Sequence, residues 1–283
     1  MIAPGMIFIL LFNIIPLAGL IMAFQNFLPA KGLLGSQWVG LDNFKFMFQL
    51  PDSRQIFVNT LVIAVSKMIL NLLVPLVFAL MLNAIRCKLL KRTLQTIVYL
   101  PNFISWVILG SIIADIFSKS GIINTLLSGV GIEPIIFMGS NTWFRPIVIL
   151  SDVWKGFGYN SIIFLAALAG IDPTLYEASA IDGATRSKQL IYITLPSIVS
   201  TIVLGTLSLG NVLNAGFDQV FNLYNPLVYR TGDIIDTYVY RMGLQNAQFS
   251  LATAVGMMKS VISFLLIIIS YKLAEKFANY RIF

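Results

Sequence analysis

The sequence predicts an all-α integral membrane protein in which six transmembrane helices form a single domain over residues 1–283. Of the 283 residues, 58% are hydrophobic and only 11% are charged, whereas a soluble domain usually carries about 25% charged residues. The apolar residues form continuous runs of about 20 to 30 residues, long enough for a helix to cross roughly 30 Å of hydrocarbon. Strands of a membrane β-barrel would be about ten residues long and would alternate polar and apolar positions.

The six apolar runs follow one another along the chain without a Pro-rich or low-complexity linker. Because a bilayer offers no water to backbone groups, each run should be a helix that satisfies its own hydrogen bonds. The first run has no basic leader and is too long for a cleavable signal, so we expect a true span there, close behind a trimmed cytoplasmic leader. The predicted spans cover residues 2–25, 56–85, 94–117, 143–169, 197–217 and 247–274.

Basic residues predict the orientation of these spans. The connection at residues 86–92 carries four Lys and Arg in seven positions, and the C-terminal tail adds Lys272, Lys276 and Arg281. Cytoplasmic segments carry such an excess, and an even number of spans places both termini on the cytoplasmic side. Four arginines on the other side (Arg54, Arg145, Arg230 and Arg241) weaken this bias. The net charge of +7 therefore fits membrane anchoring, with lipid as a partner and no nucleic acid.

Composition also excludes several kinds of site. The chain has no histidine and a single cysteine, Cys87, which excludes an intrachain disulfide, a Cys/His zinc site and His-based acid–base chemistry. It has no G-x-x-x-x-G-K-[ST] phosphate-binding loop, so any nucleotide must bind another chain. We therefore expect no catalytic residue, no metal site and no cofactor held by this chain.

The connection between the fourth and fifth spans, residues 170–196, has structural signals of its own. Asp172 before Pro173 predicts the start of a helix, because Asp is a good N-cap and proline suits the first helical position. Gly183 predicts the end of that helix, since glycine readily adopts the left-handed conformation. We expect a short helix, a glycine turn, and a second short helix that ends before Pro196. Such a helical pair could dock another protein or could only link two spans.

This loop resembles the EAA loop of permeases from binding-protein-dependent ABC importers. The matching positions are Glu177, Ala178, Gly183, Ile193, Leu195 and Pro196, with Ser179 where the family usually has a second alanine. The stretch from Tyr176 to Ala184 is similar to the MalF-like, carbohydrate-importing branch. Residues 38–44 are similar to the first-encoded sugar permease of the MalF type. Residues 224–226 and 237–241 resemble permeases for polysaccharides and oligosaccharides, including the lipoprotein-dependent and alginate types.

The resemblance implies a type I ABC importer permease fold in the bacterial cytoplasmic membrane. It implies a non-catalytic subunit that forms a heterodimer with a second permease, and each permease docks on one of two ATPase subunits, which use ATP and magnesium. An extracytoplasmic binding protein would deliver the oligosaccharide. Glu177 and Asp182 would contact the ATPase, and Gly183 would form the elbow of the loop. The residues implied in coupling are Tyr176, Glu177, Ala178, Ser179, Ala180, Asp182, Gly183 and Ala184.

Polar residues inside two spans are candidates for lining a sugar pathway, because a charge inside a span costs about 2.5–3.5 kcal/mol and is usually functional. In the fourth span, Asp152 and Lys155 are three residues apart and could pair, and amide and aromatic side chains lie close by. In the fifth span, hydroxyl, amide and acidic side chains recur every three or four residues, and amides suit hydroxyl-rich ligands. The candidates are Asp152, Lys155, Tyr159, Asn160, Ser208, Asn211, Asn214 and Asp218.

Structural roles remain open for the same residues. The fourth-span charges could form a structural ion pair, and the fifth-span amides could form hydrogen bonds between two permeases. For Lys67 and Asn71 in the second span, which Pro75 should kink, packing is the favoured interpretation. Asp115 and Lys259 suggest no role. The sequence does not distinguish a neutral sugar from an acidic one.

Two other classes of membrane protein fit the sequence less well than an importer permease. A secondary transporter or channel would need an ion-coupling site or broken helices in repeated halves, and no clear inverted repeat is visible. An intramembrane enzyme would need a catalytic constellation, and neither an Asp pair nor a Ser/Lys pair is set in a plausible site. The loop at residues 170–196 further disfavours a transporter or channel that works without ATP.

Overall fold

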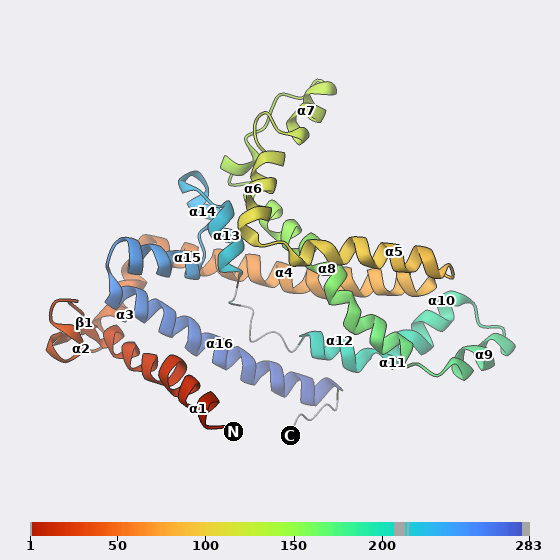
Figure 1. Cartoon of the computed structure of the whole chain (residues 1–283), viewed down its shortest axis with the longest axis horizontal. Coiled ribbons are helices and arrows are strands. Elements are labelled where there is room, and N and C mark those ends of the chain that lie inside the picture. Colours follow the sequence, from red (N-terminus) through yellow and green to blue (C-terminus); the bar gives the residue numbers. More distant parts are fainter. Residues whose placement is uncertain (1, 207–212, 214, 279–283) are drawn as a thin grey trace.

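The long helices of the chain lie side by side in the computed structural model, which describes residues 2–206, 213 and 215–278 (Figure 1). The three longest are α4 (Pro51–Ala84), α8 (Phe144–Ala169) and α16 (Phe249–Ala278). Helices α4 and α8 share the most extensive contact in the molecule. The packed centre of the bundle therefore lies between the predicted second and fourth spans.

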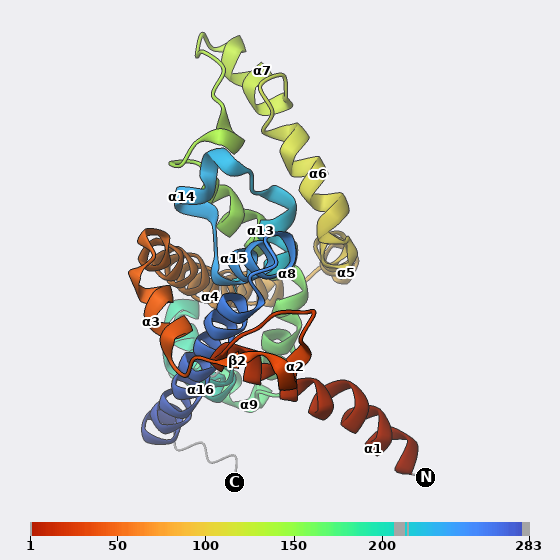
Figure 2. The same cartoon turned by 90° about the vertical axis from the view of Figure 1, so that its left-hand side faces the viewer.

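Three helical segments of the described chain are long and apolar enough to cross a bilayer: Ala3–Phe24, α4, and Phe249–Ile269 of α16. The first consists of α1 (Ala3–Ile9), the π-helical turn η1 (Leu10–Ile14) and the 3-10 segment η2 (Ile15–Phe24). The number rises to five if two bent helix pairs each count as one span. Helix α1 extends away from the bundle (Figure 2), and its apolar side chains are exposed.

The third predicted span is not one straight helix. Helix α5 (Lys88–Tyr99) runs into η3 (Leu100–Phe103), and α6 (Trp106–Ile116) then leaves at an angle of 102°. Two local features explain the break. Pro101 has no N–H for a helical hydrogen bond, and the Ser105 side chain caps a new helix by accepting from the Ile108 amide at 3.4 Å. The prediction of an unbroken helix over residues 94–117 is wrong for this reason.

The fifth predicted span, residues 197–217, also does not continue as one helix to its predicted end. After α11 (Leu195–Ser197), helix α12 covers Val199–Thr206, and α13 (Phe217–Leu223) starts only after Gly216. Gly216 has a φ of +86°, a left-handed conformation that interrupts any right-handed helix. Beyond this turn, α13 packs mainly against α6 and also contacts α8.

Short elements cover the end of the bundle opposite α9 and α10. Strands β1 (Gln25–Asn26) and β2 (Gln37–Trp38) pair antiparallel and lie beside two short helices (Figure 1). Helices α6 and α7 (Ile122–Gly129) project away from the bundle as an arm in both views (Figures 1 and 2). The other short elements of the chain are α2 (Gly32–Gly35), α3 (Asp42–Gln49), η4 (Phe137–Gly139), η7 (Pro226–Val228), α14 (Tyr229–Gly232), α15 (Ile235–Tyr240) and η8 (Arg241–Gln245).

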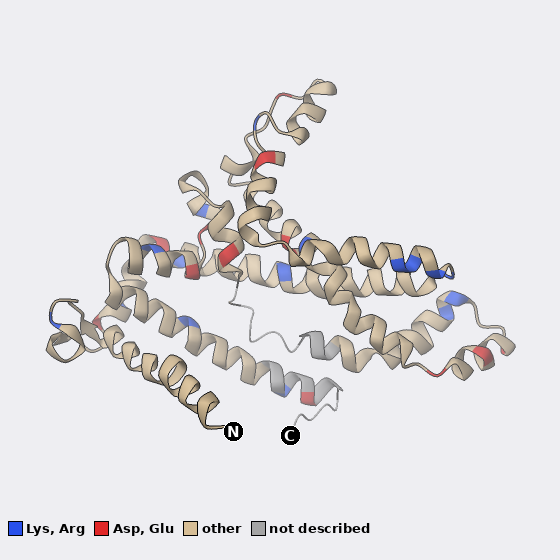
Figure 3. Cartoon of the chain, viewed as in Figure 1, with Lys and Arg blue, Asp and Glu red and all other residues tan. Residues whose placement is uncertain are grey.

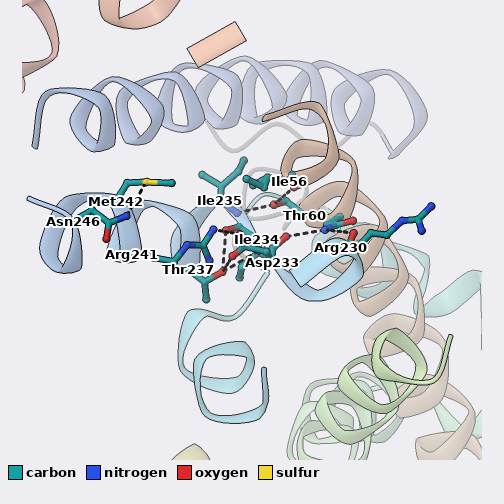
Figure 4. Close-up of polar contacts among 11 residues, drawn as sticks. Ile56, Thr60, Arg230, Asp233, Ile234, Ile235, Thr237, Arg241, Met242 and Asn246 are labelled. Carbon is teal, nitrogen blue, oxygen red and sulfur yellow. Dashed lines mark hydrogen bonds and ion pairs between the residues drawn. The ribbon is translucent and has the colours of Figure 1, made fainter. Parts of the chain in front are cut away.

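A buried polar cluster attaches α14 and α15 to α4 (Figure 4). The fully buried Asn59 side chain donates to the carbonyl oxygens of Arg230 (3.1 Å) and Asp233 (3.0 Å). The hydroxyl of Thr60 accepts from the Ile235 amide at 2.9 Å. Arg241 forms an ion pair with Asp233, whose side chain is almost completely buried. Burial alone would lower the pKa of Arg241, but the hydrogen bond and charge of Asp233 raise it above its ordinary value.

Candidate functional site

The loop between the fourth and fifth predicted spans forms two helical halves at one end of the long axis (Figure 1). Helix α9 (Pro173–Ile181) begins as predicted, because Asp172 Oδ1 accepts from the Thr174 amide at 2.9 Å. This hydrogen bond lowers the pKa of Asp172 below its ordinary value. Gly183 ends the helix with a φ of +76°, and the Ala184 amide donates back to the Ser179 carbonyl at 2.9 Å. The predicted helix start and glycine turn are confirmed.

The second half of the loop is longer than predicted. Helix α10 (Arg186–Gln189) continues through the π-helical turn η5 (Leu190–Thr194) into α11, so the helix does not end before Pro196. The π-turn widens the helix just ahead of the proline, and this accommodates a residue that has no N–H. The loop is therefore joined to α11 by continuous helix.

Side-chain hydrogen bonds connect the two halves. Gln189 Nε2 donates to the Tyr176 carbonyl at 3.2 Å and to the Ser179 hydroxyl at 2.9 Å. The hydroxyls of Tyr176 and Thr194 lie 2.9 Å apart and share a hydrogen bond. The sequence analysis did not single out Gln189 or Thr194. The only signal for them is that both are polar and lie on the second helix, where they can face the first.

These contacts sort the predicted coupling residues into two groups. Tyr176, Ser179 and Ala184 are half-buried and lie toward the interior of the loop. The exposed members form an outward surface, which also carries Ile181 at 88% exposure and Leu175 at 48%. The exposed predicted residues are Glu177, Ala178, Ala180, Asp182 and Gly183. The loop therefore presents apolar side chains and carboxylates together on a braced support.

The polar residues of the fourth span have different partners from those predicted. Asp152 does not pair with Lys155. Its Oδ1 lies 3.5 Å from Lys67 Nζ, and its Oδ2 accepts from Asn71 Nδ2 at 2.8 Å. Lys155 instead donates to the Asn102 carbonyl at 2.8 Å and lies over the Trp106 ring at 5.4 Å. Lys67 and Asn71 thus bind a candidate pathway residue, which goes beyond the packing role favoured above.

Two polar side-chain atoms, from Asn71 and Asn160, face the position that a Cβ of Gly156 on α8 would take, and we call this position the niche. Asn71 Oδ1 is buried and has no hydrogen-bond partner among the described residues. A Cβ atom placed on Gly156 would lie 3.6 Å from this oxygen and 3.3 Å from Asn160 Nδ2. One acceptor and one donor therefore converge on the space that a methyl group would fill. Asn160 is exposed, and Tyr159 next to it is 47% exposed, so the niche borders the surface.

None of the fifth-span candidates lies at this niche in the part of the chain that the structure describes. Ser208, Asn211 and Asn214 lie outside the described residues. Asp218 is exposed in the first turn of α13, and its backbone carbonyl accepts from Asn222 at 2.6 Å. Within the described chain, no contact links the Asp218 carboxylate to the niche.

Comparisons with known proteins agree with this architecture. Residues 71–279 match the family described as "Binding-protein-dependent transport system inner membrane component". The chain is 42% identical to the polygalacturonan/rhamnogalacturonan transport system permease protein YteP of Bacillus subtilis, over 100% of this chain and 89% of the relative. It is 41% identical to the protein LplB of Bacillus subtilis, over 99% of this chain and 89% of the relative.

A solved structure extends the agreement to the fold. A chain in the crystal structure of a bacterial ABC transporter that imports the acidic polysaccharide alginate superposes with a TM-score of 0.90 and 38% identity, covering 97% of this chain and 93% of that one. Sequence and fold thus give the same assignment over nearly the whole length. The chain belongs to the family of inner membrane components of binding-protein-dependent transport systems, the permease subunits of ABC importers.

Proposed function

We propose that this chain forms half of an oligosaccharide pathway, pairs with a second permease subunit, and couples that pathway to ATP hydrolysis on two partner ATPase subunits. A binding protein on the outer side delivers the sugar, and the ATPases bind ATP and magnesium. The observation that carries the coupling role is the exposed, internally braced loop at one end of the bundle.

The geometry of the loop supports coupling in a specific way. Gln189 makes α9 and α10 a single unit, because it bonds to the backbone and a side chain of α9. This unit continues through η5 and α11 toward α12. A movement of the ATPase surface against Glu177 and Ile181 would therefore pass to a membrane helix as a rigid-body displacement.

The distribution of charge supports the orientation. Basic residues of α5 and α10 lie at the same end of the bundle as α9 (Figure 3). An excess of Lys and Arg marks the cytoplasmic side. We place the loop on the cytoplasmic side, both termini with it, and strands β1 and β2 on the outer side.

The test of coupling compares two exposed glutamates. Glu177→Ala removes a carboxylate from the outward surface of α9, whereas Glu133→Ala removes one from an exposed turn after α7. A lost charge-assisted hydrogen bond costs about 1.5–3 kcal/mol, so we expect ATPase retention in co-purification to fall by about tenfold or more for Glu177→Ala alone. ATP-driven uptake should fall with it, while the amount of membrane-inserted chain stays constant. Full retention and uptake in Glu177→Ala would rule out docking through this residue.

The niche beside Gly156 supports the sugar assignment, because Asn71 Oδ1 has no donor among the described residues and the donor Asn160 Nδ2 faces the same position, a pair that would suit a hydroxyl group. Related permeases are named for polygalacturonan and galactooligosaccharides, and a structural neighbour for alginate. Uptake of these three sugar classes into proteoliposomes that hold the assembled transporter would identify the substrate. Failure to import any of them would refute the sugar pathway.

Gly156→Ala tests the niche without weakening the helix. Alanine favours a helix by about 1 kcal/mol over glycine, but here its methyl group would occupy the niche. Losing both hydrogen bonds should reduce oligosaccharide uptake by about tenfold. Gly5→Ala is the matched control, because no atom lies within 4 Å of its added Cβ. Equal uptake in both variants would remove the niche from the pathway.

A further inference from the structure

Lys67 is the most deeply buried charged side chain at the junction of α4, α8 and α13. Its side chain is 8% exposed, and its Nζ donates to the Ala215 carbonyl at 2.8 Å and to Gln219 Oε1. The same ammonium group lies 3.5 Å from Asp152 Oδ1. An ammonium group has three N–H donors, and here each has an acceptor, from two different helices and from the turn before α13.

The acceptor at Ala215 lies just ahead of α13, outside the helices of the described residues. Ala215 is fully buried and precedes Gly216, whose φ of +86° turns the chain out of the helical path. In a membrane, a carbonyl released from helical bonding costs several kcal/mol unless another donor replaces the lost one. Lys67 supplies that donor. A Cβ on Gly216 would lie 3.1 Å from Lys67 Nζ, so the glycine also leaves room for the contact.

Gln219 extends the same contact to α8. This side chain is fully buried, accepts from Lys67, and donates through Nε2 to the Val148 carbonyl (2.7 Å) and the Ser151 hydroxyl (2.8 Å). Ser151 immediately precedes Asp152, which bonds to Asn71. Because Asp152 accepts from the amide nitrogen of Asn71, the oxygen of that amide is left facing the niche.

We infer that Lys67 is a positioning residue: it holds the backbone break before α13 against α8 and, through Asp152, orients Asn71 toward the niche. Lys67 touches no substrate in this arrangement. The inference rests on the proposed function for the role of the niche, and adds that sugar affinity depends on a lysine behind it.

The test must separate positioning from simple charge balance. Removing Lys67 alone leaves Asp152 without its counter-charge, which would by itself destabilise the protein. The informative variant is therefore Lys67→Met/Asp152→Asn, compared with Asp152→Asn alone. Lys259→Met/Asp236→Asn is the matched control, because it removes another partly buried pair, with Nζ–O distances of 2.6 and 2.7 Å, that joins α16 to α15.

Two measurements on the assembled transporter decide the inference. Loss of a buried hydrogen bond is worth about 0.5–1.5 kcal/mol, so amide hydrogen exchange over residues 217–223 should quicken by roughly three- to tenfold in the double variant, and not in Asp152→Asn or the control. With an oligogalacturonide as probe, the concentration of loaded binding protein at half-maximal uptake should rise by a similar factor at nearly constant maximal rate.

Unchanged exchange in the double variant, or an equal change in the control, would overturn the positioning role. An uptake midpoint equal to that of Asp152→Asn would restrict Lys67 to charge balance and also overturn it. If the wild-type transporter imports no oligogalacturonide and none of the other sugars, the proposed function fails separately. The exchange measurement needs no sugar and still decides whether Lys67 holds the break.

Discussion

The two ends of the helix bundle are stabilised by different kinds of contact. At the coupling end, the bonds that hold α9 to the following helix join residues 10 to 18 positions apart, such as Ser179 and Gln189, and the outer surface remains exposed. At the opposite end, the contact between Asn59 and Asp233 joins residues 174 positions apart and is buried. The coupling loop is thus a self-contained unit, whereas the α14–α15 segment is part of the bundle itself.

This difference determines which end of the bundle can move: the coupling loop can, whereas the α14–α15 segment is fixed to α4. A loop that satisfies its own polar groups can be displaced by a partner without breaking long-range bonds. The α14–α15 segment cannot move relative to α4 unless the carbonyls of Arg230 and Asp233 lose their donor (Figure 4). We therefore expect changes at the coupling end to affect transport at unchanged stability, and changes at the opposite end to affect stability first.

The largest effect should follow from Asn59→Leu. This substitution leaves one buried and one partly buried carbonyl without a donor, and also removes the oxygen that accepts from Arg145. Each unsatisfied group costs about 1–3 kcal/mol, so we expect a loss of about 2–4 kcal/mol in unfolding free energy. The measurement is thermal unfolding of the purified protein. Asn141→Ala, at an exposed hydrogen bond to the Leu227 carbonyl, is the control and should change the midpoint little.

The same contrast explains which parts of the molecule the sequence predicted. The start of α9 at Asp172 and its end at Gly183 are local signals, since capping and positive φ depend on neighbouring residues only. The bend after Phe103 also has local causes in Pro101 and Ser105. The continuous hydropathy of residues 94–117 nevertheless led to the prediction of one unbroken helix. A hydropathy pattern predicts that a segment is buried in lipid and says little about a bend within it.

Contacts between residues that are far apart in the sequence could not be predicted from the sequence alone. Asp152 and Lys155 have the spacing of a helical ion pair, yet Asp152 pairs with Lys67 on α4 because α4 and α8 pack along their length. No spacing rule on one helix can choose between a local and a distant partner. The same packing leaves Asn71 Oδ1, at the niche, without a hydrogen-bond partner among the described residues. No feature of the sequence indicated this.

An intermediate effect is expected for Gln189→Met, which keeps the side-chain length and removes both hydrogen bonds to α9. The bonds are only half-buried, so we expect a cost of about 1 kcal/mol, confined to the loop. Uptake driven by ATP should fall severalfold while thermal unfolding of the whole protein stays unchanged. A fall in thermal stability comparable to that of Asn59→Leu would contradict the view that the loop is a self-contained unit.

The smallest effect concerns the cap at Asp172 and depends on pH. The Thr174 amide lowers the pKa of the Asp172 carboxyl, so the ionised cap stabilises α9 at pH values above the ordinary Asp pKa. That contribution is lost as the pH falls through the lowered pKa of the folded loop. We expect the Thr174 amide to be better protected from hydrogen exchange in the wild type than in Asp172→Ala near neutral pH, with the two converging in strong acid.

Asp172→Asn keeps a capping oxygen that does not titrate, so the protection of the Thr174 amide in this variant should be independent of pH. A difference between wild type and Asp172→Ala that persists below the lowered pKa would show that the charge of the cap is not what stabilises α9.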